Sequence, residues 1–268
     1  CRTMPSTLPS EPKAPNRAGT TRAGRLVTGA ASLVILVLVW KLLAFLVGKD
    51  ILLPAPEKVL GEALALYPTG KFLAALWATF LRGSVAFLIS IVLGSLVGIA
   101  AGLSPLFSAA LAPILTIIRA TPVLALILVA LLWFPSGFVP VFAAVLMCFP
   151  IMVTSASSGV HACDRRLLEM AALFQVPRKE QLLRLRLPEA APFLLSGARN
   201  SLGMSWKVVV AGEVLSQPLR ALGSGMQESR VLLETPRVLA WAAASVLLCG
   251  LTEWLFGFVT KAASRHGI

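Results

Sequence analysis

The sequence predicts an all-α membrane protein that crosses the bilayer six times. Of the 268 residues, 57% are hydrophobic and only 13% are charged, and the mean hydropathy of +0.84 lies outside the range of ordinary soluble domains. Runs such as 26–47 and 238–260 are long enough to cross about 30 Å of hydrocarbon as helices. The six predicted spans are 26–47, 72–102, 106–134, 138–160, 189–212 and 238–260.

The basic residues predict how these spans are oriented. Six crossings place the segments 1–25, 161–187 and 261–268 on one side, where they hold 13 lysines and arginines against six on the other side. Lysine and arginine accumulate on the cytoplasmic side of membrane proteins, so both termini and the long loop are expected in the cytoplasm. A basic N-terminus near anionic lipid accounts for much of the net charge of +12, and nucleic acid is not an expected partner.

Two tails flank the predicted transmembrane domain, which covers 26–260 and includes the loop 161–188. Residues 1–25 are rich in Pro, Thr and Arg and have few apolar residues, which predicts a disordered cytoplasmic tail. Residues 261–268 form a short tail on the same side. After the first span, the prolines of 52–70 predict a short amphipathic helix at the outer surface of the membrane.

Glycines and an arginine mark spans that face protein. Gly94, Gly98 and Gly102 recur every four residues and would lie on one helix face, where they let a second helix approach closely. Chance spacing in a glycine-containing span is the alternative. Arg119 lies in the third span close to Pro122. It either belongs to a broken helix that lines a translocation path, or it extends its charge to the cytoplasmic interface.

The fifth span carries Lys207 and Glu213 in an apolar context. They are six residues apart, too far for a pair on one helix face, so each is expected to find a partner on another helix or to lie at an interface. Lys207 is the stronger candidate for a translocation path. Glu213 is either a second path residue or a marker of the outer end of the helix.

Catalytic and metal chemistry are not expected. His161 and His266 are the only histidines of the sequence, and no Ser-His-Asp, HExxH or CxxC arrangement occurs. The four cysteines have no paired spacing, which argues against a disulfide framework or a zinc site. The sequence also has no phosphate-binding loop, so no cofactor is expected in this chain.

The loop 161–188 is predicted to form two helices joined by a turn. Asp164 is a suitable N-cap for a first helix that contains Glu169 and the alanines after it. Pro177 ends this helix and suits the start of a second one over 177–187. The leucines of the second helix would pack against the bundle while its basic residues stay in water. A soluble partner could then dock on the exposed first helix.

This loop resembles the Glu-Ala-Ala loop of ABC importer permeases. Glu169, Ala171, Leu185, Leu187 and Pro188 stand at matching positions of the family pattern, with its spacing preserved. The five matches lie between 169 and 188, and two of them fall in the first predicted helix.

Two positions of the loop depart from the family pattern. Met170 replaces an alanine, and Gln175 replaces a glycine that permits a left-handed turn. The geometry of the turn is therefore open, because Pro177 could end the first helix instead. Further segments similar to the nitrate, sulfonate, taurine and bicarbonate permeases of this class are 51–60, 118–134, 205–215 and 235–248.

The resemblance implies a fold, partners and site residues. The fold is the type I ABC importer permease fold, in which two permease subunits, here two copies of this chain, form the path and the loop acts as a coupling helix. Separate ATPase subunits would bind ATP and Mg, and an extracytoplasmic binding protein would deliver a small, anionic solute. The implied location is the inner membrane of a bacterium, in contact with lipid. The implied coupling residues are Glu169, Met170, Ala171, Ala172, Gln175, Arg178, Leu187 and Pro188, and the path residues are Arg119, Thr121, Pro122, Trp206, Lys207 and Glu213.

Two other functions are open at this stage. A stand-alone carrier driven by an ion gradient would commonly show inverted repeats, which are not evident in the sequence, and would have no need of the loop. A membrane scaffold without transport activity would tolerate the loss of the charges at Arg119 and Lys207.

Overall fold

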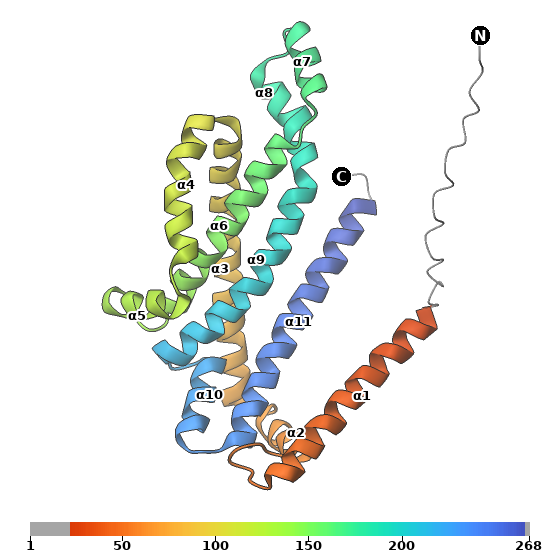
Figure 1. Ribbon diagram of the computed structural model, residues 1–268. Coiled ribbons are helices and arrows are strands. Elements are labelled where there is room, and N and C mark those ends of the chain that lie inside the picture. The colour runs from red at the N-terminus through yellow and green to blue at the C-terminus, as the bar shows by residue number, and fades with distance from the viewer. Residues whose placement is uncertain (1–21, 266–268) are drawn as a thin grey trace, which may run out of the picture.

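The computed structural model describes residues 22–265, and every element in this range is a helix (Figure 1). The predictions for 1–21 and 266–268, which are most of the two tails, lie outside the described residues. The first helix, α1 (Arg22–Val47), begins before the predicted start of its span, and the last helix, α11 (Thr235–Arg265), continues past the predicted end. The all-α prediction is confirmed for this part of the chain.

Three long helices form the centre of the bundle, namely α3 (Gly70–Leu103), α6 (Val139–His161) and α9 (Leu187–Ser216). α6 packs along α3 on one side and along α9 on the other. Because apolar side chains between these helices are removed from both water and lipid, their packing is the rigid frame that holds the other elements.

The predicted glycine face of α3 lies against α6. A Cβ atom added at Gly98 would lie 2.5 Å from the carbonyl oxygen of Val153, and one at Gly102 would lie 2.7 Å from Cβ of Val160. Gly94 is equally close to α6. The close-approach interpretation of these glycines is therefore confirmed, and chance spacing is not needed to explain them.

Two short helices gather at one end of the bundle (Figure 1). α2 (Pro56–Leu66) is the predicted amphipathic helix, whereas α10 (Leu222–Val231) was not predicted. Both pack against α11, and α10 also packs against α9. The buried cluster that joins them to α3 and α11 includes Ala63, Leu66, Phe72, Leu222, Ala240 and Trp241.

The third predicted span, 106–134, is a broken helix, which was one of the two alternatives for this segment. It is divided into α4 (Pro105–Ala120) and α5 (Val123–Trp133), which meet at an angle of 97°. Pro122 causes the break because it has no N–H to donate and disfavours the helical conformation at Thr121, whose ψ is 125°. α5 turns aside before it reaches the end of the bundle where α2 and α10 lie (Figure 1).

Fewer helices are apolar enough to cross a membrane than the six predicted spans require. Within the described residues, four helices are long and apolar enough to cross a membrane, or five if α4 and α5 form one broken span. α9 has 30 residues, but Arg199, Lys207 and Glu213 lower its apolar character. The chain is a multi-pass membrane protein, and the count of six spans stays a prediction.

α1 stands apart from the central bundle and diverges from α11 (Figure 1). It packs mainly on α2, where Lys41 forms an ion pair with Glu57. Most of its leucine and valine side chains are exposed in the isolated chain. An apolar helix with so little protein contact requires lipid or a second protein surface around it.

The helices of the loop, α7 (Arg165–Leu173) and α8 (Arg178–Gln181), project from the end of the bundle opposite to α2 and α10 (Figure 1). The start of α1 and the end of α11 are directed toward the same side as α7 in this view.

Candidate functional site: the projecting loop and two cavities

Two interactions between neighbouring residues stabilise the first helix of the loop. The carboxylate of Asp164 accepts a hydrogen bond from the backbone N–H of Arg166 at 2.8 Å, so Asp164 is the predicted N-cap of α7. Arg165 Nε donates to Glu169 Oε1 at 3.0 Å, one helical turn further along. This contact holds Glu169 on the outer surface of α7, where its carboxylate is exposed.

The turn after α7 contains a residue in the left-handed conformation that glycine usually adopts, but this residue is a glutamine. Gln175 has a φ angle of 53°, in the left-handed region. Its N–H donates to the carbonyl oxygen of Ala172 at 3.0 Å, and the N–H of Val176 donates to that of Ala171 at 2.9 Å, which is the pattern of a Schellman motif. The family turn is therefore kept, and Gln175 carries the strain that glycine would avoid.

The outer surface of α7 is apolar. Met170, Leu173 and Phe174 are 50%, 83% and 77% exposed, and the small side chain of Ala172 is exposed beside them. Exposing large apolar side chains to water is unfavourable, and exposed apolar patches of this kind are common where a protein contacts another protein or a membrane.

The other predicted coupling residues have mixed environments. Ala171 is buried inside the loop, so its small size serves packing within this chain. Leu187 is half-buried, whereas Gln175, Arg178 and Pro188 are exposed. Not all leucines of the second arm pack as expected, since the side chain of Leu183 is exposed.

The second arm of the loop does not form the separate helix predicted over 177–187. α8 continues through a π-helical turn, Leu182–Arg186, directly into α9. Pro188 cannot donate to the α-helical ladder, and the N–H of Leu187 donates to the carbonyl oxygen of Leu182, five residues back. The loop is thereby joined to a central helix without a flexible connection.

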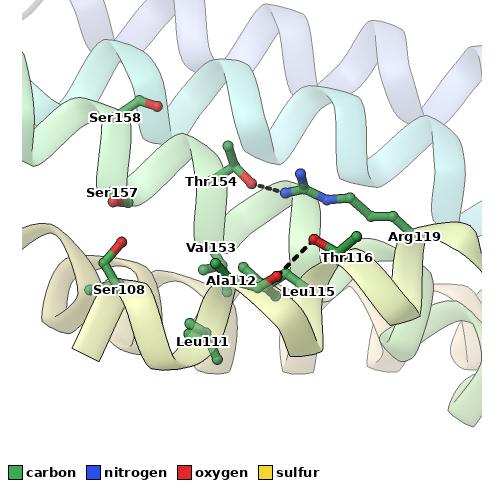
Figure 2. A pocket seen from close by; sticks show the side chains of 11 residues that line it. Ser108, Leu111, Ala112, Leu115, Thr116, Arg119, Val153, Thr154, Ser157 and Ser158 are labelled. Carbon is green, nitrogen blue, oxygen red and sulfur yellow. Dashed lines mark hydrogen bonds between the residues drawn. The ribbon is translucent and has the colours of Figure 1, made fainter. Parts of the chain in front are cut away.

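A polar cleft of about 230 Å³ lies between α4 and α6. Figure 2 shows that both helices contribute hydroxyl groups to it. These come from Ser108, Thr116, Thr154, Ser157 and Ser158. A hydroxyl group both donates and accepts hydrogen bonds, so the cleft suits a hydrated or polar solute better than a lipid chain.

Arg119 supplies the charge of this cleft. Its guanidinium group donates to the carbonyl oxygen of Pro150 at 3.1 Å and to the hydroxyl of Thr154 (Figure 2). Among the described residues, no acidic side chain lines the cleft, so the other N–H groups of Arg119 are available to an anion. Arg119 is in the last turn of α4, at the end remote from the loop, and its side chain reaches α6. This position argues against the alternative in which the guanidinium group reaches the membrane interface on the side of the loop.

Thr121 and Pro122 form the break between α4 and α5 and do not line this cleft. The Thr121 hydroxyl donates to the carbonyl oxygen of Ile117 at 2.8 Å, inside its own helix. Their role is to end α4 directly after Arg119.

A second cavity, of about 540 Å³, lies between α9, α10 and α11. Its lining is mainly apolar and includes Trp206 and Lys207. Trp206 is 2% exposed and stacks on Phe80 with 5.9 Å between ring centroids, and its indole N–H has no partner among the described residues. The two cavities share no residue, so Arg119 and Lys207 are not brought together in the isolated chain.

Glu213 has its partners in the core of the protein. Its buried carboxylate accepts hydrogen bonds from Arg82 Nη1 at 2.9 Å, from the Thr79 hydroxyl at 2.9 and 3.0 Å, and from the N–H of Gly223 at 3.2 Å. Arg82 also donates to the carbonyl oxygen of Arg220 at 2.8 Å. The expected partner on another helix is confirmed. The network joins α3, α9 and α10, as structural buried ion pairs do.

Sequence reasoning missed two groups of residues. Arg82 was not recognised as the partner of Glu213, although opposite charges in two apolar spans are a signal for a pair. The hydroxyl groups of the cleft were also missed. The spacing of Thr154, Ser157 and Ser158 places them on one face of α6 and could have indicated a polar surface.

Over 22–265, no group of three or more His, Cys, Asp or Glu side chains is placed to hold a metal ion. Burial raises the pKa of the Cys163 thiol at the base of the loop, which keeps this thiol protonated and unreactive.

The described residues combine membrane-spanning helices, a projecting loop with exposed apolar side chains, and a polar cleft that contains an arginine, which are features expected of a membrane transport protein. Residues 90–265 match the family described as binding-protein-dependent transport system inner membrane component, and the chain belongs to this family. Members are permease subunits of ABC importers, in which a separate subunit hydrolyses ATP, so this chain is not an enzyme.

Several curated relatives have a similar sequence. The chain is 32% identical over 229 residues to the taurine transport system permease protein TauC of Escherichia coli, with 83% of each chain covered. It is 27% identical to the putative aliphatic sulfonates transport permease protein SsuC of Bacillus subtilis, covering 82% of this chain and 80% of SsuC. Identity to the nitrate import permease protein NrtB of Synechocystis is also 27%, covering 71% and 72% of the two chains.

A solved structure shares the fold. A chain of the methionine ABC transporter MetNI, in an inward-facing conformation, superimposes with a TM-score of 0.61 at 16% identity and covers 71% of this chain and 95% of that one. The predicted type I importer permease fold is thereby confirmed.

Proposed function

We propose that this chain forms the membrane path of an ATP-driven importer for a small solute that carries an oxyanion group. The relatives are named for taurine, aliphatic sulfonates and nitrate, and each of these solutes presents negatively charged oxygen atoms. A guanidinium group is the side chain best suited to such oxygens, because its donors match their geometry. The cleft of Arg119 has this chemistry.

The partners in the proposal follow from the two ends of the molecule. ATPase subunits, which bind ATP and Mg, dock on the loop in the cytoplasm. A binding protein delivers the solute at the opposite, extracytoplasmic end, where α2 and α10 lie. Both tails are then cytoplasmic in a bacterial inner membrane, which the common direction of α1, α11 and α7 supports. A second copy of the chain completes the path and, with lipid, covers α1.

The exposed apolar surface of α7 is the observation that carries the coupling role. Met170, Leu173 and Phe174 are not covered by any other part of residues 22–265, and Ala172 allows a partner to approach closely. Glu169 provides a charge at the edge of the same surface. The further coupling residues in the proposal are Gln175, Arg178, Leu187 and Pro188, which form the turn and the connection to α9.

The continuous connection from the loop to α9 supplies the mechanical link. When the ATPase subunits close on ATP, α7 moves with them, and the π-helical turn transmits the displacement to α9 as to a rigid body. α9 packs along α6, which forms one wall of the polar cleft. ATP binding therefore changes the access to Arg119 by shifting the helices that surround it.

The docking of the ATPase is tested with Ala172→Arg. Arginine at this position separates the two surfaces, so we expect at least roughly tenfold weaker retention of the ATPase in a pull-down with the purified full chain. Glu169→Ala is expected to weaken retention in the same direction. Leu219→Arg is the matched control, because Leu219 is fully exposed in the turn between α9 and α10 at the other end of the molecule. Undiminished retention by both loop variants would contradict the coupling role.

A further inference from the structure

A basic pocket lies beside the base of the loop, away from the apolar surface of α7, and shares only Arg178 with the coupling residues proposed above. It has a volume of about 630 Å³ and is formed where the last turn of α3 meets α8 and the π-helical turn. Its lining residues are Leu103, Arg178, Lys179, Gln181, Leu182 and Arg186.

The charges of this pocket are not neutralised within the described chain. Arg178, Lys179 and Arg186 line it together, and no carboxylate is among the lining residues. Arg184, on the same turn, is different, because it pairs with Glu180 at 4.0 Å and does not line the pocket. Three neighbouring cations repel one another, so a bound anion would relieve this repulsion.

The apolar part of the lining indicates what kind of anion fits. Leu103 is the last residue of α3, a helix long and apolar enough to cross the membrane, and its side chain is 43% exposed. Leu182 continues this apolar wall on the side of the loop. The pocket therefore joins a basic rim to an apolar wall at the end of a membrane span, the depth at which phospholipid headgroups lie.

We propose that this pocket binds the phosphate-bearing headgroup of an anionic membrane phospholipid. Its phosphate lies between Lys179 and Arg186, and the first part of an acyl chain lies along Leu103. Such a lipid fixes the height of α8 and of the π-helical turn relative to the membrane surface. Lipid binding would then influence how firmly the loop is held when it transmits movement, without a direct contact to solute or nucleotide.

The experiment measures lipid retention by the purified full chain in detergent, by native mass spectrometry. Phosphatidylglycerol is added in one series and zwitterionic phosphatidylcholine in the other. The wild-type chain is expected to retain phosphatidylglycerol selectively, and the double variant Lys179→Gln, Arg186→Gln about 25-fold less, since each basic residue near an anionic surface contributes roughly fivefold. Arg184→Gln, the matched control, is expected to behave as the wild type. Equal retention by wild type and double variant would overturn the proposal.

Three further measurements separate the alternatives. Millimolar inorganic phosphate should not displace the lipid; if it does so fully, the pocket binds free phosphate and the lipid assignment is wrong. If the double variant loses the ATPase in lipid-free detergent, the pocket belongs to the protein interface and the proposal also fails. A thermal unfolding midpoint equal to that of Arg184→Gln shows that the variant is folded. Lipid retention needs neither ATPase nor transport. If the lipid proposal fails, the proposed function is therefore unaffected, and if the proposed function fails, the lipid proposal is unaffected.

Discussion

Arg119 is the charged residue on which the proposed path depends. Its guanidinium group donates to Pro150 and Thr154 and has other N–H groups left for a solute. The sequence indicated this residue because an arginine close to a proline in an apolar span is unfavourable unless it faces protein or water. The spacing of the hydroxyl residues in α6 could have indicated a polar face, but not that this face lies opposite Arg119, because only tertiary packing brings α4 and α6 together.

We predict that Arg119→Ala lowers the apparent affinity for solute in uptake assays. A hydrogen bond to a charged group contributes about 1.5–3 kcal/mol, so the loss should be about tenfold or more. Arg119→Lys keeps the charge but not the planar donor arrangement. Its apparent affinity for solute should lie between those of the wild type and Arg119→Ala. Retention of the ATPase in pull-downs should be unchanged.

The comparison with Lys207→Ala decides which cavity belongs to the path. Lys207 lines the apolar cavity of α9, α10 and α11, which shares no residue with the polar cleft. A large loss of uptake in Lys207→Ala together with normal uptake in Arg119→Ala would assign the path to the apolar cavity and contradict our assignment.

Gln175 carries backbone strain that a glycine would remove. Because its φ angle is 53°, Gln175→Gly should stabilise the end of α7 by about 1 kcal/mol. Hydrogen exchange of the neighbouring backbone amides in the turn, such as that of Val176, should then be about fivefold slower. Gln227→Gly, inside α10, is the control. Glycine weakens a helix interior, so backbone amides of α10 should exchange faster in this variant. Faster exchange in the turn of the Gln175→Gly variant would show that the strain is absent.

At the scale of elements, the contact between α3 and α6 is the one that the sequence predicted best. A four-residue spacing of glycines defines a face by helix geometry alone, so no knowledge of the partner helix was needed. The N-cap of α7 was predictable for the same reason, because the signal at Asp164 acts within a few residues of chain, whereas the sequence left the turn at Gln175 open.

Gly98→Ala tests this contact. The added Cβ would lie 2.5 Å from the carbonyl oxygen of Val153 and 2.6 Å from Cβ of Ala156, so α3 and α6 must separate. We expect a loss of about 1–3 kcal/mol in stability, seen as a lower thermal unfolding midpoint of the purified chain. Gly257→Ala in α11 is the matched control, because nothing lies within 4 Å of its added Cβ, and it should be neutral or stabilising. Equal midpoints for both variants would contradict the close packing.

At two elements the sequence prediction was incomplete, because it gave a broken third span as only one of two alternatives and did not predict the π-helical turn. Pro113 and Pro122 give the same signal in the sequence, yet α4 continues through Pro113 and ends before Pro122. The π-helical turn of Leu182–Arg186 also has no clear sequence signal, because it arises where two helical segments join without a break. A proline permits a break or a π-helical turn without requiring one, so the local sequence alone did not decide either conformation.

At the scale of the whole molecule, the two proposed activities lie at separate places along the same helices. The docking surface is on α7, beyond the end of the bundle, and the polar cleft is between α4 and α6 (Figures 1 and 2). α9 and α6 connect them by continuous packing. The charge distribution and the length of the spans predicted this general plan, whereas α10, the divergence of α1 and the angle between α4 and α5 depend on tertiary contacts.

Reconstitution in vesicles tests the central claim, that this permease works only when a separate ATPase moves its loop. The chain is incorporated into lipid vesicles with and without the ATPase and the binding protein, and uptake of labelled taurine, an aliphatic sulfonate and nitrate is measured. The account predicts that at least one of these solutes enters only when the ATPase, the binding protein and ATP with Mg are all present, and that Ala172→Arg abolishes this uptake. Uptake by vesicles that contain the chain alone, driven by an ion gradient, would contradict it.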